Sequence, residues 1–172
     1  MATGDVKKVY ASSSALTVTN LHSLAASATF IGGWESGAVD NTSNLYLDYR
    51  ITAKLVTHAS NRQAGTIRLY LVGPTDDSAW PDVIDGTEST ESFTDTEERD
   101  AVAILAGSIE VDNTASATYE IHIPSVAAVF GGNLPKKFVI FITGDAATST
   151  NAQLAAAGSV VTVTGSYENV AA

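Results

Sequence analysis

The chain has 172 residues, of which 45 % are apolar and 16 % are charged, and it contains no cysteine. This length predicts a single domain that buries a core of its own without disulfides or a structural metal. The lack of cysteine excludes disulfide bonds, thiol chemistry and cysteine-ligated metal centres. No apolar run approaches the ~18 residues of a membrane span, and the first residues lack the apolar stretch of a secretory signal, so no membrane partner is expected.

The acidic charge is concentrated in one stretch. The formal net charge is −10, and residues 76–100 alone hold ten carboxylates and one arginine. A net negative chain repels polyanions, which disfavours direct binding to nucleic acid. The rest of the chain is nearly neutral and rich in Ala, Ser and Thr, a composition that suits burial against copies or partners because interfaces are depleted in lysine and glutamate.

Alternating apolar and polar residues predict strands along most of the chain. The first two are residues 15–19 and residues 24–31, the second ending at Gly32 and Gly33. The clearest is residues 44–56, with one apolar face and one polar face. The predicted buried face comprises Leu45, Leu47, Tyr49, Ile51, Ala53 and Leu55. The later strands are predicted at residues 66–72, 101–111, 117–123, 137–143 and 159–167.

About eight strands separated by turn residues predict an all-β fold, an antiparallel β-sandwich of jelly-roll type. The long connections, residues 73–100 and 124–136, are expected to cross between the two sheets. Residues 1–12 lack strong periodicity and are predicted to be an N-terminal arm that orders on contact, outside a single sandwich domain of residues 13–172.

One or two short helices are expected to connect strands. The capping-box pattern of residues 94–97 predicts Thr94 as the cap of a helix that leads into residue 101. Residues 124–131 place a proline at the start and a glycine just past the end of a second short helix.

Residues that could carry chemistry are scattered. His22, His58 and His122 lie far apart in the sequence without metal-ligand spacing, and His122 alternates with isoleucines, which predicts an exposed position. The sequence has no nucleophile elbow and no phosphate-binding glycine loop. No catalytic residue and no cofactor are therefore expected, and an enzyme is the least favoured class.

The acidic stretch allows one metal hypothesis. Asp76, Asp77, Asp82 and Asp85 could supply oxygen ligands to calcium, which takes six to eight of them. Their spacing does not match a calcium-binding loop, so a solvated acidic surface loop is the favoured interpretation.

Aromatic residues allow two interpretations. Trp34 and Trp80 could stack on sugar rings, but packing of the acidic loop onto the sandwich is favoured because such large rings are seldom left bare. Phe130, Phe138 and Phe141 are predicted to lie in or near the core.

Four stretches of the sequence resemble a group of tailed-bacteriophage virion proteins. The similarity covers roughly residues 40–170 and is moderately specific, in particular the Phe-Gly-Gly-x-x-Pro motif before an aromatic-rich strand. The stretches are Trp80–Gly86, Thr94–Asp100, Ser125–Pro135 and Gly158–Glu168.

The resemblance implies a structural protein of the phage head or tail, without catalytic residues. Small, cysteine-free β-sandwich proteins of phages are often head decoration (cement) proteins, commonly trimeric. The resulting hypothesis is a capsid decoration protein on the surface of the virion, made in the cytoplasm of the host bacterium. Its expected partners are the major capsid protein and copies of itself in a homotrimer.

The predicted contact residues are Lys7, Lys8 and Val9 in the arm, together with Trp34 and Trp80. A carbohydrate- or receptor-binding jelly-roll head of a tail fibre or spike, and a minor tail or neck protein, are the alternatives.

Overall fold

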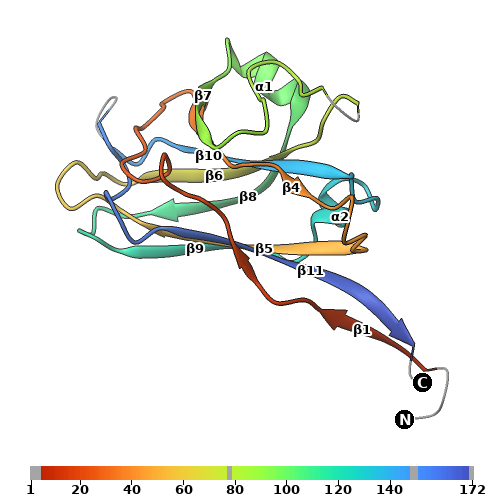
Figure 1. Ribbon diagram of the computed structural model, residues 1–172. Helices are drawn as coiled ribbons and strands as arrows, with labels where there is room; N and C mark the ends of the chain where they lie inside the picture. Colours follow the sequence, from red (N-terminus) through yellow and green to blue (C-terminus); the bar gives the residue numbers. More distant parts are fainter. Residues whose placement is uncertain (1–4, 77–78, 148–150, 171–172) are drawn as a thin grey trace.

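The computed structural model describes residues 5–76, 79–147 and 151–170. They form two antiparallel sheets packed face to face, with two short helices at the periphery (Figure 1). The predicted all-β antiparallel sandwich is therefore confirmed. Sheet 1 contains β1 (Val6–Tyr10), β2 (Ser14–Ala15), β5 (Asp48–Val56), β9 (Thr118–Ile123) and β11 (Val160–Val170). Sheet 2 contains β3 (Gly32–Glu35), β4 (Val39–Asp40), β6 (Gly65–Val72), β7 (Ser89–Ser92), β8 (Ala103–Val111) and β10 (Lys137–Gly144).

The strand order is that of a jelly roll. β1 and β2 pair with successive parts of β11, and β3 and β4 pair with successive parts of β10, so each pair acts as one interrupted strand. Sheet 1 then reads β1-β11-β5-β9, and sheet 2 reads β3-β10-β6-β8 with β7 added at its edge. Among eight main strands, these orders are first-eighth-third-sixth and second-seventh-fourth-fifth, the two interlocked Greek keys of a jelly roll.

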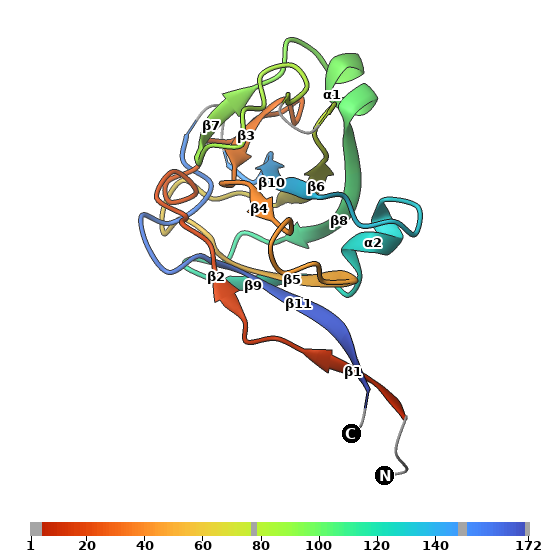
Figure 2. The same cartoon turned by 45° about the vertical axis from the view of Figure 1, so that its right-hand side comes forward.

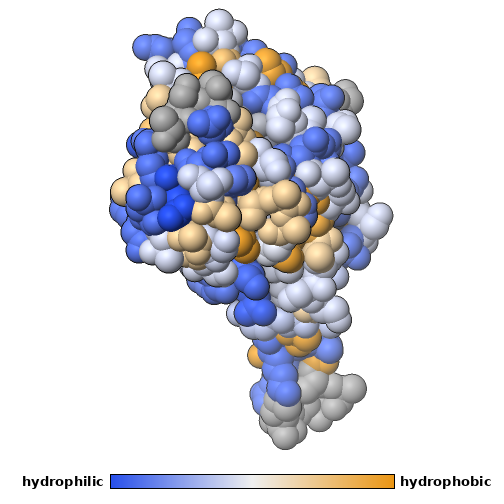
Figure 3. All heavy atoms as spheres, turned by 90° about the vertical axis from the view of Figure 1, so that its left-hand side faces the viewer, coloured by the Kyte–Doolittle hydropathy of each residue, from blue (hydrophilic) through white to orange (hydrophobic). Residues whose placement is uncertain are grey.

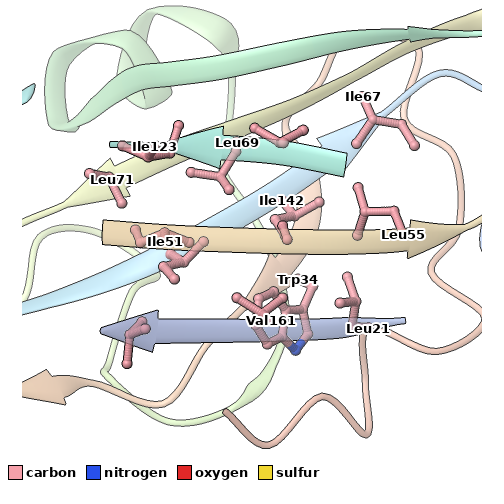
Figure 4. Close-up of a cluster of buried hydrophobic side chains, with 14 of the residues drawn as sticks. Leu21, Trp34, Ile51, Leu55, Ile67, Leu69, Leu71, Ile123, Ile142 and Val161 are labelled. Atoms are coloured by element: carbon pink, nitrogen blue, oxygen red, sulfur yellow. The ribbon is translucent and has the colours of Figure 1, made fainter. Parts of the chain in front are cut away.

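The main core lies between the two sheets. β5 alternates strictly between buried and more exposed residues, as a strand with one covered face should. β10 is buried over almost its whole length because both faces of sheet 2 are covered at that point. Figure 4 shows the cluster, in which Trp34 of β3 points between the sheets toward Ile51 and Val161. Phe138 and Phe141 are fully buried, and Phe130 packs beside Phe138, so all three lie in or near a core, as predicted.

Three predicted strand segments are wrong in whole or in part. Of residues 15–19, only Ala15 belongs to a strand, because β2 ends there. Residues 24–31 form turns rather than a strand, with Phe30 in the left-handed region and only Ala25 bridging to residue 152. Leu45 and Leu47 were expected on the buried face, but they are 72 % and 58 % exposed. Leu45 has a φ of 51°, which interrupts the extended backbone, so β5 begins only at Asp48.

The connections differ from the expectation in two respects. Residues 124–136 cross from β9 to β10 as predicted and contain α2 (Val126–Val129), capped by Ser125. Residues 73–100 do not cross, because β6 and β8 are neighbours in sheet 2. They belong to a segment that folds back over the outer face of that sheet and ends in α1 (Thr96–Val102). The cap of α1 is Asp95, one residue after the predicted Thr94.

Candidate interaction surface

A two-stranded ribbon projects from one end of the sandwich. β1 pairs with residues 166–170 of β11, whereas β5 pairs with β11 only as far as Ser166. The two strands therefore leave the body together, without a third strand and without a facing sheet (Figures 1 and 2). An isolated two-stranded ribbon is marginally stable in water, so this element depends on what contacts it. We call residues 6–10 and 166–170 the ribbon.

The ribbon has two distinct faces because successive side chains of a strand point to opposite sides. Val9 is opposite Tyr167, whose ring stacks on Tyr46 at a centroid distance of 6.1 Å, so these residues face the side of the sandwich core. We call this side the inner face; it also carries Lys7 and Asn169. The outer face carries Val6, Lys8, Tyr10, Glu168 and Val170.

Tyr46 joins the ribbon to the body. Its ring lies against Gly165, where a Cβ would come within 2.1 Å of the tyrosine ring, and it meets Tyr49 edge-on at 5.4 Å. The backbone N–H of Leu47 donates to the carbonyl of Ser166, so Leu47 continues the line of β5 beside the ribbon. Leu45, Leu47, Tyr46 and the inner face therefore form one continuous surface at this end.

Exposed hydrophobic side chains are concentrated at this same end. Among the described residues, nine large hydrophobic side chains are exposed, and six of them lie on the ribbon or in the adjoining loop. These six are Val6, Tyr10, Leu45, Leu47, Tyr167 and Val170. They divide between the two sides of the ribbon, with Leu45, Leu47 and Tyr167 on the inner side and Val6, Tyr10 and Val170 on the outer side. Each set exposes on the order of 300 Å², the size of the largest apolar patch on many monomers. Two such patches on an unsupported element make this end the candidate interaction surface.

The predicted contact residues fall in different environments. Lys7, Lys8 and Val9 all lie in the ribbon, within the segment predicted as an arm. Trp34 is fully buried, so its prediction as a surface contact is wrong: it fills the core between the sheets. Trp80 is partly buried and packs with the hydrophobic residues beneath residues 73–102. This packing confirms the interpretation of Trp80 as an anchor of the acidic loop.

Residues 73–102, which we call the cover segment, build a second core on the outer face of sheet 2. Ile84 and Phe93 of this segment pack against Tyr70, Val139 and Phe141 of the sheet. Gly86, with a φ of 80°, allows the close approach of the Trp80 indole, which lies 2.8 Å from the position of a Cβ. The acidic stretch is thus a folded layer rather than a freely solvated loop.

Three charged residues attach the cover segment to the sandwich. Glu35 of β3 is fully buried, and its carboxylate accepts the backbone N–H of Gly86 at 2.6 Å. Burial raises the pKa of Glu35 to about 7, and the nearby carboxylates of Asp85 and Glu91 add to this effect. Glu88 accepts the indole N–H of Trp34 at 2.7 Å.

The third attachment is Arg99, which is 5 % exposed. Its Nη1 donates to the carbonyls of Thr29 and Phe30, and its Nη2 pairs with Asp100 at 2.7 Å. A buried guanidinium in this position satisfies carbonyls that the turn at residues 29–30 would otherwise leave unpaired. Glu35, Glu88 and Arg99 were not anticipated from the sequence, since nothing in their local pattern predicts burial.

The calcium candidates do not converge. Asp76 and Asp85 accept backbone N–H groups within their own turns, from Ala79 and Thr87 respectively. Burial and the neighbouring carboxyl of Glu98 raise the pKa of Asp82. Asp77 lies outside the described residues. Within the part of the chain that the structure describes, no three His, Asp or Glu side chains are placed to hold a metal ion.

Two shallow grooves adjoin each other beside β3 and β7, with volumes of about 450 and 520 Å³. The first is lined by hydroxyl and amide groups such as those of Asn20, Ser27 and Thr90, with Glu91 as the carboxylate. Among the described residues, no Phe, Tyr or Trp ring lines it. His22 lies at this groove, where its Nε2–H donates to the carbonyl of Ser159. His122 is exposed on sheet 1, as predicted.

The loops near these grooves carry almost no charge. Residues 11–34 and 146–167 contain no Asp, Glu, Lys or Arg. The two segments run side by side, with the N–H of Ser23 donating to the carbonyl of Ala155 and Ala25 bridging to Ala152. Figure 3 views this end of the molecule, where weakly apolar residues gather near the centre and the ribbon forms the stem below.

Comparisons with known proteins give no relative: no family model matches the chain, and a search of curated proteins finds no significant match. The resemblance to phage virion proteins therefore stays a prediction from motifs. Neither helix in the described ranges is long and apolar enough to cross a membrane.

Proposed function

We propose that this chain is a structural protein of a tailed-bacteriophage particle, a decoration protein that binds the lattice of the major capsid protein at the capsid surface. The observation that carries the proposal is the concentration of exposed hydrophobic side chains on the ribbon end. Binding energy gained only on the assembled shell stabilises that shell by linkage. The jelly-roll fold, which recurs in viral capsid proteins, is consistent with this role but does not by itself select it.

The inner face and the adjoining loop are the surface proposed to meet the shell. Leu45 and Leu47 are the most exposed leucines in the described chain, and the N–H of Leu47 donates to the carbonyl of Ser166, the residue before Tyr167. Burying a leucine side chain contributes roughly 1.5–3 kcal/mol, so loss of both residues should weaken binding at one site by more than tenfold. Lys7, at the edge of this surface, then sits where it can pair with a carboxylate of the shell.

The test is binding of purified protein to shells of the parent phage that lack it. The double variant Leu45→Ser, Leu47→Ser should reduce occupancy at least tenfold at a fixed concentration and abolish the thermal protection of the shell. Leu105→Ser is the matched control, because Leu105 is 52 % exposed on β8, away from the ribbon. Full occupancy by the double variant, or equal loss in the control, would refute the assignment. Removal of residues 1–12, which deletes β1, should also abolish occupancy.

A glycan-binding head of a tail fibre or spike is the second candidate. The groove of about 450 Å³ beside β3 and β7 favours it, because its hydroxyl and amide lining suits sugar hydroxyls. Binding of the isolated protein to a glycan array, abolished by Asn20→Ala and Thr90→Val, would replace the decoration proposal. A low copy number per particle would instead support a minor tail or neck protein.

A further inference from the structure

The outer face of the ribbon is complementary in charge to the same face of a second copy. Along the ribbon, Val6 is opposite Val170, Lys8 is opposite Glu168, and Tyr10 is opposite Ser166. A charged pair of opposite sign is therefore flanked by an apolar pair at one end and an aromatic ring at the other. The ring of Tyr10 lies 5.2 Å from the guanidinium of Arg50, which fixes it on this side of sheet 1.

We infer that this outer face is a contact between two copies of the chain. The two copies are related by a two-fold axis that lies between their outer faces, parallel to the strands of the ribbon. Such an axis lays each strand of one copy over the other strand of the second copy. Lys8 then faces Glu168 of the second copy, and Val6 faces its Val170. The two bodies lie on opposite sides of the contact, because the outer face of sheet 1 points away from sheet 2.

Edge-to-edge pairing of β1 with a second β1 is disfavoured by the same residues. An antiparallel pairing centred on Lys8 would place two lysines directly opposite each other, which is destabilising. Lysines on an edge strand are a common means of preventing this pairing. The charges of the ribbon therefore favour contact through its outer face over contact through its edge.

The contact is small, so the association is weak. Five residue pairs cover roughly 17 Å by 10 Å, well below the ~800 Å² per partner of a stable complex. It becomes effective where copies are held close together, because a high local concentration compensates for low affinity. The inference goes beyond the proposed function, since it concerns the isolated chain and leaves the inner face available to a shell. It joins copies in pairs, so the predicted homotrimer would require a different surface.

Charge exchange between two variants tests the inference. Each of the variants Lys8→Glu and Glu168→Lys leaves charges of only one sign on the outer face. Each variant alone should therefore self-associate at least tenfold more weakly than the parent in sedimentation experiments up to about 1 mM. Their equimolar mixture should associate more tightly than either variant alone, because the faces are then of opposite sign. Leu105→Ser should associate like the parent. A parent that stays monomeric at about 1 mM, or a mixture no tighter than the single variants, would overturn the inference.

Cross-linking in the cysteine-free chain fixes the geometry. Mixing Val6→Cys with Val170→Cys should give a disulfide-linked heterodimer at least tenfold more abundant than the homodimers of either. Mixing Val9→Cys with Tyr167→Cys should give none, since these residues lie on the inner face. Equal cross-linking by the second mixture would instead show exchange of β1 between copies and would refute the face-to-face contact. None of these measurements involves a shell, so they can fail without affecting the proposed docking.

Discussion

Replacing Glu35 by glutamine tests how the cover segment is attached. The carboxyl group of Glu35 is buried beneath residues 85–86, and burial raises its pKa from 4.5 to about 7. The folded state therefore holds a proton that the unfolded chain releases between pH 4.5 and pH 7. By linkage, the contribution of this group to stability is fully present below pH 4.5 and is lost as the pH rises through 7.

The magnitude follows from the size of the shift. A shift of about 2.5 units corresponds to about 3 kcal/mol between the protonated and ionised forms of the folded state. For a domain of this size, that free energy corresponds to roughly 6–12 °C in the melting temperature. Glutamine resembles the protonated acid and keeps an oxygen to accept the N–H of Gly86. The Glu35→Gln variant should therefore be more stable than the parent at pH 8 and close to it at pH 5.

The assay is thermal unfolding of both proteins between pH 4.5 and pH 8.5. The difference in melting temperature between variant and parent should grow between pH 4.5 and about pH 7 and level off above pH 7. Glu110→Gln, which changes an exposed carboxylate that accepts from the hydroxyl of Thr66, is the control and should not reproduce the pH-dependent difference of Glu35→Gln. If the Glu35→Gln variant shows the same pH dependence as the parent, Glu35 does not carry the proton and the reasoning is wrong.

Three further substitutions probe the packing. Phe93→Ala should lower the free energy of unfolding by about 3–5 kcal/mol in denaturant titrations, because it leaves a cavity in the second core. A loss under 1 kcal/mol would mean that the cover segment is not packed on the sheet. Arg99→Met should cost about 1–3 kcal/mol by removing the donor to the part-buried carbonyls of Thr29 and Phe30, and a neutral result would contradict its role as an attachment. Gly165→Ala should cost about 1–3 kcal/mol by displacing the ring of Tyr46, and a double-mutant cycle with Tyr46→Ala should show that the two effects are not additive.

The sandwich could be predicted because its pattern is local. The alternation of residues 48–56 is visible in the sequence, and it follows from the one buried face of β5. Residues 66–72 were also predicted as a strand, although β6 is buried on both faces at its end. The prediction failed at Leu45 and Leu47, where alternation continues but the backbone turns at residue 45. Alternation specifies which face a residue would take in a strand, but not where the facing sheet ends. Sheet 1 extends past sheet 2 at this point, so these leucines have no cover.

The interaction surface could be predicted only in part. Lys7, Lys8 and Val9 were located by the lack of a pattern in the first residues, but their pairing with residues 167–169 is a long-range contact that no local signal reports. Trp34 was misplaced because a tryptophan after two glycines resembles a strand end. In the fold, Gly33 instead leaves room for Phe141, whose ring lies 2.6 Å from the position of a Cβ. Tertiary packing thus decided which aromatic residues are buried and which stay exposed.

The position of the acidic charge is compatible with both proposed contacts. Ten of the nineteen carboxylates lie in residues 76–100, within the segment that covers the outer face of sheet 2. The ribbon leaves the sandwich from sheet 1, on the opposite side (Figure 1). Two copies that meet through their outer ribbon faces therefore keep their acidic segments on the far sides of the pair, separated by more than the Debye length of about 8 Å at physiological salt. Raising the ionic strength should then weaken the attraction between Lys8 and Glu168 of the two copies without relieving any repulsion. The self-association should therefore decrease with salt. An increase would show that the acidic segments face each other.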